Sequence, residues 1–445
     1  MKTEAVRFKT DTYFSINPLP SGLSDQILEF SVFYKLGLSL GYHYIHSPFH
    51  SPQRALPPPP LGMVPPLVNP HPITNIYRKL CRKFYDYWHR LEGKSFPDPY
   101  DFLGFNSYLA RRNISIPTME DLEKIDLELG DSTLEKNSIK TFEELQYFIR
   151  NFLSQKSPGK KKTLVTFRAT SLPYLMGELI HSNIPNYQDG LNLNKTYFEA
   201  KQRHPWKSIF KERKLKIVMH VRQGDVAVIE TPWNTFIPVW LKKLVEYKTF
   251  SDIQYDNRVL HLDEYYQFIK KILSHLQDTD CSSLIFSDGF TRAFSQLTLK
   301  GVKNLNLTKD QLKNLIKSAK SYDEKAFKKF TTIGGSTLIL GEHPRKLCDL
   351  LHSILVADII IIGPRAGMVP KLLATYGHVD TMPIVIVLHK GTPPPFSQID
   401  YMGLHAKAKN FIYVNIVNDD YEGILLELTN MVANRHPKQQ HAQVS

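Results

Sequence analysis

The second half of the chain alternates short apolar runs with stretches in which apolar residues recur every three or four positions. The run from Leu215 to Val221 has the length of a buried strand, and the apolar residues between Tyr265 and Leu276 recur at helical spacing. Further strands are expected at 283–286, 336–340, 359–362, 384–388 and 411–416, and further helices at 308–320, 344–355 and 424–432. Strands that are apolar throughout and alternate with helices predict a parallel sheet covered on both faces, and hence a doubly wound α/β domain.

The first half of the chain is less regular. Apolar residues at helical spacing over 23–38 predict a helix, and the run over 164–167 has strand character. The proline-rich stretch over 57–72 can only be an extended loop. The charged stretch that ends near residue 153 is expected to be helical. We therefore predict a second α/β layer with a helical insertion.

These patterns divide the chain into two domains and a tail. Residues 1–210 form the predicted first domain, residues 211–433 the predicted second domain, and the polar residues 434–445 a disordered tail. A length of 445 residues suits two large domains. A hydrophobic content of 42% is sufficient for full-sized cores, which excludes a disordered or fibrous chain.

The chain is basic, with 56 lysines and arginines against 43 acidic residues and a formal net charge of +13. Such a charge favours an anionic partner, namely a phosphorylated substrate, an anionic membrane face or nucleic acid. Nucleic acid is the weakest of these, because the sequence contains no zinc finger and no RNA-binding aromatic signature. Three cysteines far apart predict reduced thiols, and no stretch resembles a signal peptide or a membrane span, so we expect a cytoplasmic protein.

Ligands of open α/β sheets bind at the carboxyl ends of the strands, so the residues after each expected strand are candidates for a site. Arg222, Gln223, Gly224 and Asp225 follow the strand that ends at Val221. Arginine has a planar fork of N–H donors that suits phosphate, and it stays charged. Alternatively, Arg222 and Asp225 pair with each other or cap the following turn.

Two later strands also end in polar residues and glycine. Asp288 and Gly289 follow one of them, and the carboxylate suits a ribose or base contact, although Asp-Gly is also a common turn pair. Arg365 lies between Gly363 and Gly367 after the other, just before an expected helix. A phosphate could bind there, and a plain strand-to-helix turn is the alternative.

Another candidate segment precedes the first expected helix. Ser21, Gly22 and Asp25 lie at its start, where backbone N–H groups form a natural anion site. An ordinary helix cap made by serine explains the same residues. No cluster of histidine, cysteine and carboxylate residues has the spacing of metal ligands, so we expect neither a metal site nor a bound cofactor.

Several of these features, in this order over most of the chain, resemble the fucosyltransferase-like superfamily of GT-B glycosyltransferases. The first domain of that group begins with a segment similar to Gly22-Leu-Ser-Asp-Gln-Ile27. Its second domain opens on a strand that ends in His-x-Arg, similar to His220-Val-Arg222. Ser287-Asp288 and the segment from Ala357 to Gly363 resemble its later motifs. The resemblance implies a GT-B-like fold of two facing Rossmann-type doubly wound domains, with the donor on the second and the acceptor between them.

The resemblance also implies roles for individual residues. Arg222 would bind the donor diphosphate, and His220 would help to shape that site. Glu230, eight residues after Arg222, corresponds to the proposed catalytic base of the α1,6 branch, and Asp225 is the second candidate. The segment His261-Leu-Asp-Glu-Tyr265 is similar to the start of a helix in that branch. Ser21, Gly22, Asp25, Asp288 and Arg365 complete the donor-binding candidates.

The sequence departs from the α1,6 branch at two places. Gln223 stands where the branch has a second arginine. The segment Pro364-Arg365-Ala366-Gly367 replaces a serine-rich loop that often contacts the nucleotide. Arg365 could restore the missing positive charge from another strand.

Cleavage of a sugar–diphosphate bond leaves a dianion, which requires positive charge as it develops. Without a metal, arginine and helix N-termini must supply that charge, and a carboxylate removes the proton of the acceptor hydroxyl. We therefore expect a metal-independent inverting transferase that moves fucose from GDP-fucose to a glycan. Its basic surface would suit an acidic acceptor or an anionic membrane. The alternatives are a transferase for a different nucleotide sugar, a non-catalytic protein that binds a GDP-sugar or a glycan, and, from charge alone, a nucleic-acid binder.

Overall fold

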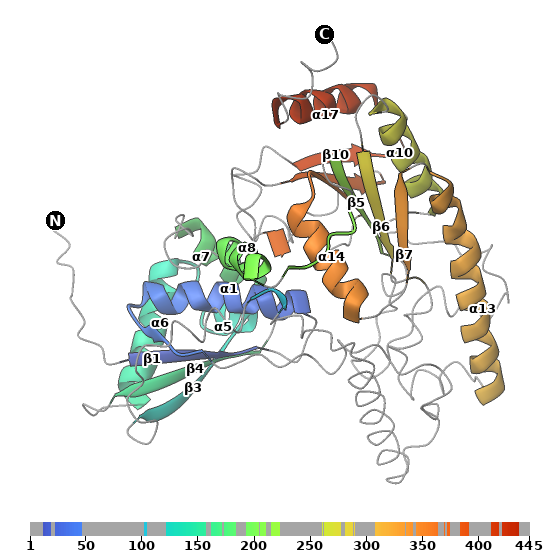
Figure 1. Cartoon of the computed structure of the whole chain (residues 1–445). Coiled ribbons are helices and arrows are strands. Elements are labelled where there is room, and N and C mark those ends of the chain that lie inside the picture. Colours follow the sequence, from blue (N-terminus) through green and yellow to red (C-terminus); the bar gives the residue numbers. More distant parts are fainter. Residues whose placement is uncertain are drawn as a thin grey trace.

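The computed structural model shows a mixed α/β protein with two parallel sheets and helices around them (Figure 1). It describes residues 12–18, 23–46, 102–104, 122–156, 162–170, 173–183, 193–203, 205–210, 215–222, 260, 262–276, 281–287, 289, 308–333, 335–340, 344–363, 369, 372–373, 383–390, 411–417 and 421–435. Within these ranges, no helix is both long enough and apolar enough to cross a membrane.

The first sheet has four strands in the order β2-β1-β4-β3, and each neighbouring pair is parallel. Its strands are β1 (Thr12–Asn17), β2 (His43–Tyr44), β3 (Glu123–Leu129) and β4 (Thr163–Ala169). The helices that the structure describes in this half are α1 (Leu23–Ser39), α5 (Asp131–Lys136), α6 (Phe142–Lys156), α7 (Tyr174–Asn183) and α8 (Leu193–Arg203). Apolar side chains of α1 and α7 pack in one core with Phe14, Val165 and Phe167 of the sheet.

Strand β3 corrects the expectation that the charged stretch ending near residue 153 is helical throughout. Ile125, Leu127 and Leu129 are buried, whereas the charged residues between them are exposed. This alternation is typical of an edge strand with one buried face. The outward charges gave the segment a polar composition that conceals its apolar face. The end of the stretch, which forms α6, is helical as expected.

The second sheet has six parallel strands in the order β10-β9-β8-β5-β6-β7. They are β5 (Leu215–Val221), β6 (Cys281–Ser287), β7 (Ser336–Leu340), β8 (Ile359–Ile362), β9 (Ile384–His389) and β10 (Phe411–Asn415), which confirms the six strands expected in this half. Counted along the chain, the order is 6-5-4-1-2-3, the order of doubly wound dinucleotide-binding sheets.

Helices pack against both faces of the second sheet. One face carries Ile217 and Ile361 and packs against α10 (Leu262–His275), the end of α13 (Lys309–Lys328) and α17 (Glu422–Arg435). The other face carries Val218 and Ile360 and packs against α14 (Pro344–Val356), where Cys348 is fully buried. Because both faces are covered, most residues of the strands are apolar.

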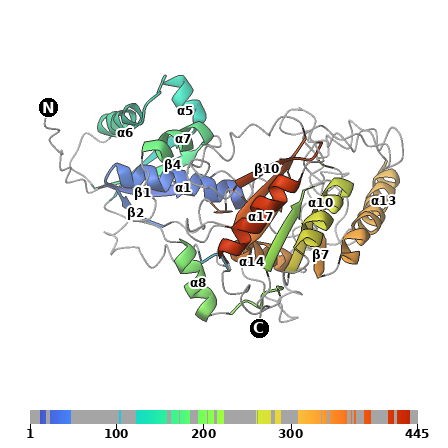
Figure 2. The same ribbon diagram turned by 90° about the horizontal axis from the view of Figure 1, so that it is seen from above.

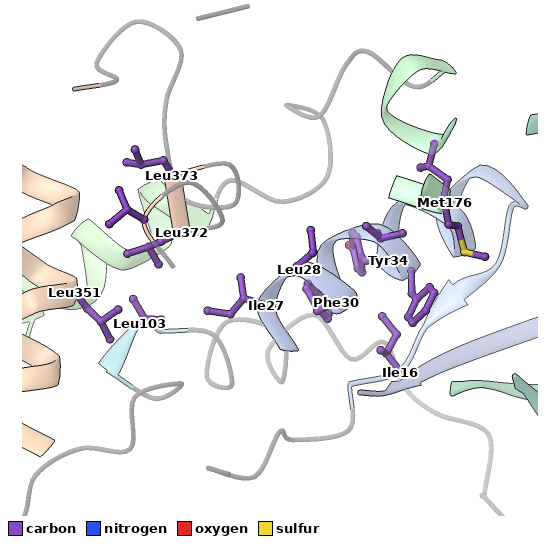
Figure 3. Close-up of a cluster of buried hydrophobic side chains, with 14 of the residues drawn as sticks. Ile16, Ile27, Leu28, Phe30, Tyr34, Leu103, Met176, Leu351, Leu372 and Leu373 are labelled. Atoms are coloured by element: carbon purple, nitrogen blue, oxygen red, sulfur yellow. The ribbon is translucent and has the colours of Figure 1, made fainter. Parts of the chain in front are cut away.

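The apolar core on the α14 side continues into the first half of the chain. Figure 3 shows Ile27 of α1 pointing toward Leu103, Leu351 and Leu372, which belong to three other segments. Figure 2 shows α8 on the same side of the molecule as α14.

Two polar contacts join the end of the first half to α14. The hydroxyl of Tyr197 on α8 lies 2.6 Å from Nδ1 of His352. Trp206 donates from Nε1 to Asp349 over 3.1 Å. The strands of each sheet lie on one side of residue 210, and the domain boundary there stays a prediction. Helix α17 includes Asn434 and Arg435, and the rest of the expected tail lies outside the described residues.

Candidate functional site

The second sheet has a topological switch point between β5 and β8. From β5 the chain continues outward to β6 and β7 on one side, and from β8 to β9 and β10 on the other. Ligands of open α/β sheets bind beyond the carboxyl ends of the strands at such a point. His220 pairs in register with Ile362, so Arg222 and Gly363, which follow the two strands, are adjacent at this edge.

Arg222 is partly exposed at this edge and lies near a buried phenol. Burial raises the pKa of Tyr265 on α10 well above its usual range, the Glu264 carboxylate raises it further, and the Arg222 guanidinium lowers it. These charge effects place Arg222 and Glu264 within electrostatic reach of the Tyr265 hydroxyl. The phenol is therefore a neutral O–H group throughout the physiological pH range.

Gly363, which directly follows β8, is in direct contact with the same phenol. A Cβ atom at this position would overlap the Tyr265 hydroxyl. Only glycine leaves room for the tyrosine, so α10, β5 and β8 meet at one point beside Arg222. The sequence pattern His261-Leu-Asp-Glu-Tyr265 thus contributes the residue that fills the space beneath the switch point.

The neighbouring strand adds a second cation. Lys390 directly follows β9, and its ammonium lies 2.6 Å from Oε1 of Glu264. Both side chains keep about a quarter of their surface exposed, 24% for Lys390 and 28% for Glu264. Asp263, the residue before Glu264, pairs instead with Lys329 of the short 3-10 helix η3 (Lys329–Thr332) and is 83% exposed.

A buried carboxylate lies at the carboxyl end of β6. Asp323 of α13 is 3% exposed, and its Oδ2 would be 2.6 Å from a Cβ atom placed on Gly289. Gly289 has a φ of +68° and donates its N–H to Oγ of Ser287 over 3.1 Å. That geometry fits the turn typical of Asp-Gly.

The structure describes three of the nine candidate site residues. His220 and Arg222 lie together at the end of β5, and Asp25 lies in the first turn of α1, after β1 of the other sheet. Ser21, Gly22, Asp225, Glu230, Asp288 and Arg365 lie outside the described residues.

Three residues at this edge were not among the candidates, namely Tyr265, Lys390 and Asp323. Lys390 could have been found, because it follows an apolar strand just as Arg222 does. Asp323 carries no such signal, since it is on a helix and reaches Gly289 only through the fold.

The arrangement suits an anion. Arg222 is permanently charged, Lys390 adds a second positive group, and both follow parallel strands that end at the same edge. Within the described part of the chain, no group of histidine, cysteine and carboxylate side chains could hold a metal ion. Arginine binds phosphate through its planar fork of N–H donors, and lysine binds phosphate as a point charge.

The sequence matches no protein-family model, and no curated protein matches it either.

Proposed function

We propose that the protein is an inverting glycosyltransferase that transfers fucose from GDP-fucose to a hydroxyl group of a glycan without a metal. The observation that carries the proposal is the position of Arg222. It directly follows β5 at the switch point of a sheet with the strand order of nucleotide-binding proteins. We also propose that the two parallel sheets belong to the two facing domains of a GT-B fold.

The charges at the carboxyl edge of the second sheet support transfer from a diphosphate donor. Cleavage of the sugar–phosphate bond leaves negative charge on the nucleoside diphosphate, and preorganised positive groups stabilise that charge as it develops. Arg222 meets this requirement, because its guanidinium cannot lose its proton. Tyr265 is buried and packs directly against Gly363, beside the end of β5 that carries Arg222.

The identity of the donor and the choice of the catalytic base are inferred from the sequence alone. His220-Val-Arg222 and His261-Leu-Asp-Glu-Tyr265 resemble the α1,6 branch and support GDP-fucose as donor. Glu230, with Asp225 as the second candidate, would take the proton of the acceptor hydroxyl in a single displacement that inverts the anomeric centre.

Thermal unfolding with GDP, UDP, ADP and GDP-fucose, each with and without EDTA, tests the proposal. A ligand that binds only the folded state adds about 2.7 kcal/mol of stability at 100 times its Kd. We expect GDP and GDP-fucose alone to raise the unfolding temperature, equally with EDTA. A preference for UDP would overturn the proposal that fucose is the transferred sugar. The absence of a response to any nucleotide would overturn the proposal that the protein is a glycosyltransferase.

Activity separates the proposal from its alternative. The transferase should hydrolyse GDP-fucose slowly or transfer its fucose to a glycan acceptor. GDP binding without either reaction would identify a non-catalytic protein of the same fold.

A further inference from the structure

We infer that Lys390, held in place by Glu264, is a second residue that binds the diphosphate of the donor. The inference rests on the proposed function, and it deepens the description of the same site. Lys390 directly follows β9, and its ammonium is fixed by an ion pair of 2.6 Å with Glu264 at the start of α10.

The sheet sets the spacing between the two cations. Arg222 follows β5 and Lys390 follows β9, with β8 between these strands. Neighbouring strands are about 4.8 Å apart, so the two strand ends lie about 10 Å from each other. A diphosphate between two long basic side chains bridges this span.

Lys390 also supplies the positive charge that the sequence lacks beside Arg222. Gln223 follows Arg222 where the α1,6 branch, which this sequence resembles, has a second arginine. A lysine at the end of another strand contributes the same charge from the opposite side of Gly363. Lysine binds phosphate as a point charge, so its origin on a different strand is no obstacle.

Glu264 has a positioning role in this arrangement. An ammonium has three N–H donors, and Glu264 accepts one of them at Oε1. The ion pair therefore holds the lysine in one orientation while donors remain for phosphate oxygens. Since Glu264 also lies beside Tyr265, the same carboxylate links Lys390 to the contact between Tyr265 and Gly363.

The adjacent ion pair provides a matched control. Asp263 and Lys329 form a pair one residue earlier on α10, but Lys329 belongs to η3 and not to the end of a strand. K329Q and K390Q each remove one positive charge and one ion pair to a carboxylate in the first turn of α10.

Binding of GDP, GMP and inorganic pyrophosphate to the full chain, measured by calorimetry, tests the inference. We expect K390Q to weaken GDP and pyrophosphate by roughly 10-fold or more, as loss of a charged hydrogen bond implies, and GMP by less. K329Q should bind all three as the wild type does, and K390R should recover part of the affinity. Equal GDP and pyrophosphate affinity of folded K390Q and wild type would overturn the role of Lys390.

A second measurement needs no variant and remains informative if K390Q does not fold. Lysine acylation of the wild-type protein is followed at each residue by mass spectrometry, with and without pyrophosphate. Pyrophosphate should protect Lys390 but not Lys329, and equal labelling of Lys390 in both samples would contradict the inference.

The two proposals fail in different ways. If the wild-type protein binds pyrophosphate but no nucleotide, Lys390 remains a candidate anion-binding residue and the proposal of a nucleotide donor is overturned. If the wild type and K390Q bind GDP equally well, the nucleotide donor is supported and the role of Lys390 is overturned. Binding of neither compound overturns both.

Discussion

The hydroxyl of Tyr265 lies against Gly363, so that helix α10 and strand β8 meet without room for a single additional carbon atom. Tyr265 is 1% exposed and cannot move toward solvent without leaving its place among the apolar side chains of α10 and the sheet. The contact lies next to Arg222, whose charge acts on the phenol. Substitutions at this contact are therefore expected to affect the stability of this edge of the sheet.

We expect G363A to destabilise the protein. The added methyl group would overlap the Tyr265 hydroxyl, and overpacking of this kind costs about 1–3 kcal/mol. Urea denaturation measures the loss. G423A is the control, because nothing lies within 4 Å of a Cβ atom at that helical position, and its effect should be neutral or slightly stabilising.

The double variant G363A/Y265F isolates the cause. Removal of the hydroxyl opens space for the new methyl group, so the double variant should be more stable than the sum of the single changes predicts. Simple additivity would contradict the proposed overlap.

The contact between Tyr197 and His352 predicts a dependence of stability on pH. Burial, together with the charges of Lys201 and Lys216, lowers the pKa of His352 to about 4. The unfolded chain binds the proton at its ordinary pKa of 6.5, so the folded state binds fewer protons between the two values. The stability from His352 is complete above pH 6.5 and is lost as the pH falls toward 4, by about 3 kcal/mol at most.

The variant H352N tests this dependence, because asparagine can still accept a hydrogen bond from Tyr197 but does not titrate. Urea denaturation between pH 4 and pH 7 should show a smaller loss of stability in H352N than in the wild type. H275N, which removes an exposed imidazole, is the control for the loss of a histidine. The same pH profile in H352N and the wild type would show that another group governs the acid range.

The second sheet could be predicted from the sequence, whereas half of the first could not. Strands such as β8 are apolar at every residue because both faces are covered, so composition alone reveals them. Strand β3 has one exposed face, and its alternate charged residues conceal it. Strand β1 has the same difficulty, since Tyr13 and Asn17 flank only a short buried segment.

The candidate site was predictable where a strand led directly to it. Arg222 was found because it follows an apolar strand, and Lys390 meets the same criterion at the end of β9. Asp323 could not be found, because it reaches Gly289 from the helix that follows β6. Likewise, no local pattern indicates that Gly363 must accommodate the tyrosine of a helix almost a hundred residues earlier.

We expect R222A to weaken GDP binding by roughly 10- to 100-fold, since it removes charge-assisted hydrogen bonds to phosphate. R222K should recover only part of the affinity, because lysine keeps the charge and loses the planar fork. Calorimetry measures both variants. R168A is the control, since Arg168 pairs with Asp126 over 2.8 Å on the exposed side of the first sheet. Wild-type turnover in R222A would show that the donor binds elsewhere.

Substitution of Arg222 should weaken nucleotide binding, whereas substitution of Glu230 should slow the transfer step. Glu230 would act on the acceptor hydroxyl and not on the nucleotide, so E230Q should keep the GDP affinity of the wild type and lose turnover by about 100-fold or more. D225N is the matched comparison, because Asp225 is the second candidate for the base in the same segment. Loss of turnover in D225N alone would transfer the role to Asp225. Unchanged turnover in both variants would exclude this segment as the source of the base, even if GDP binding is confirmed.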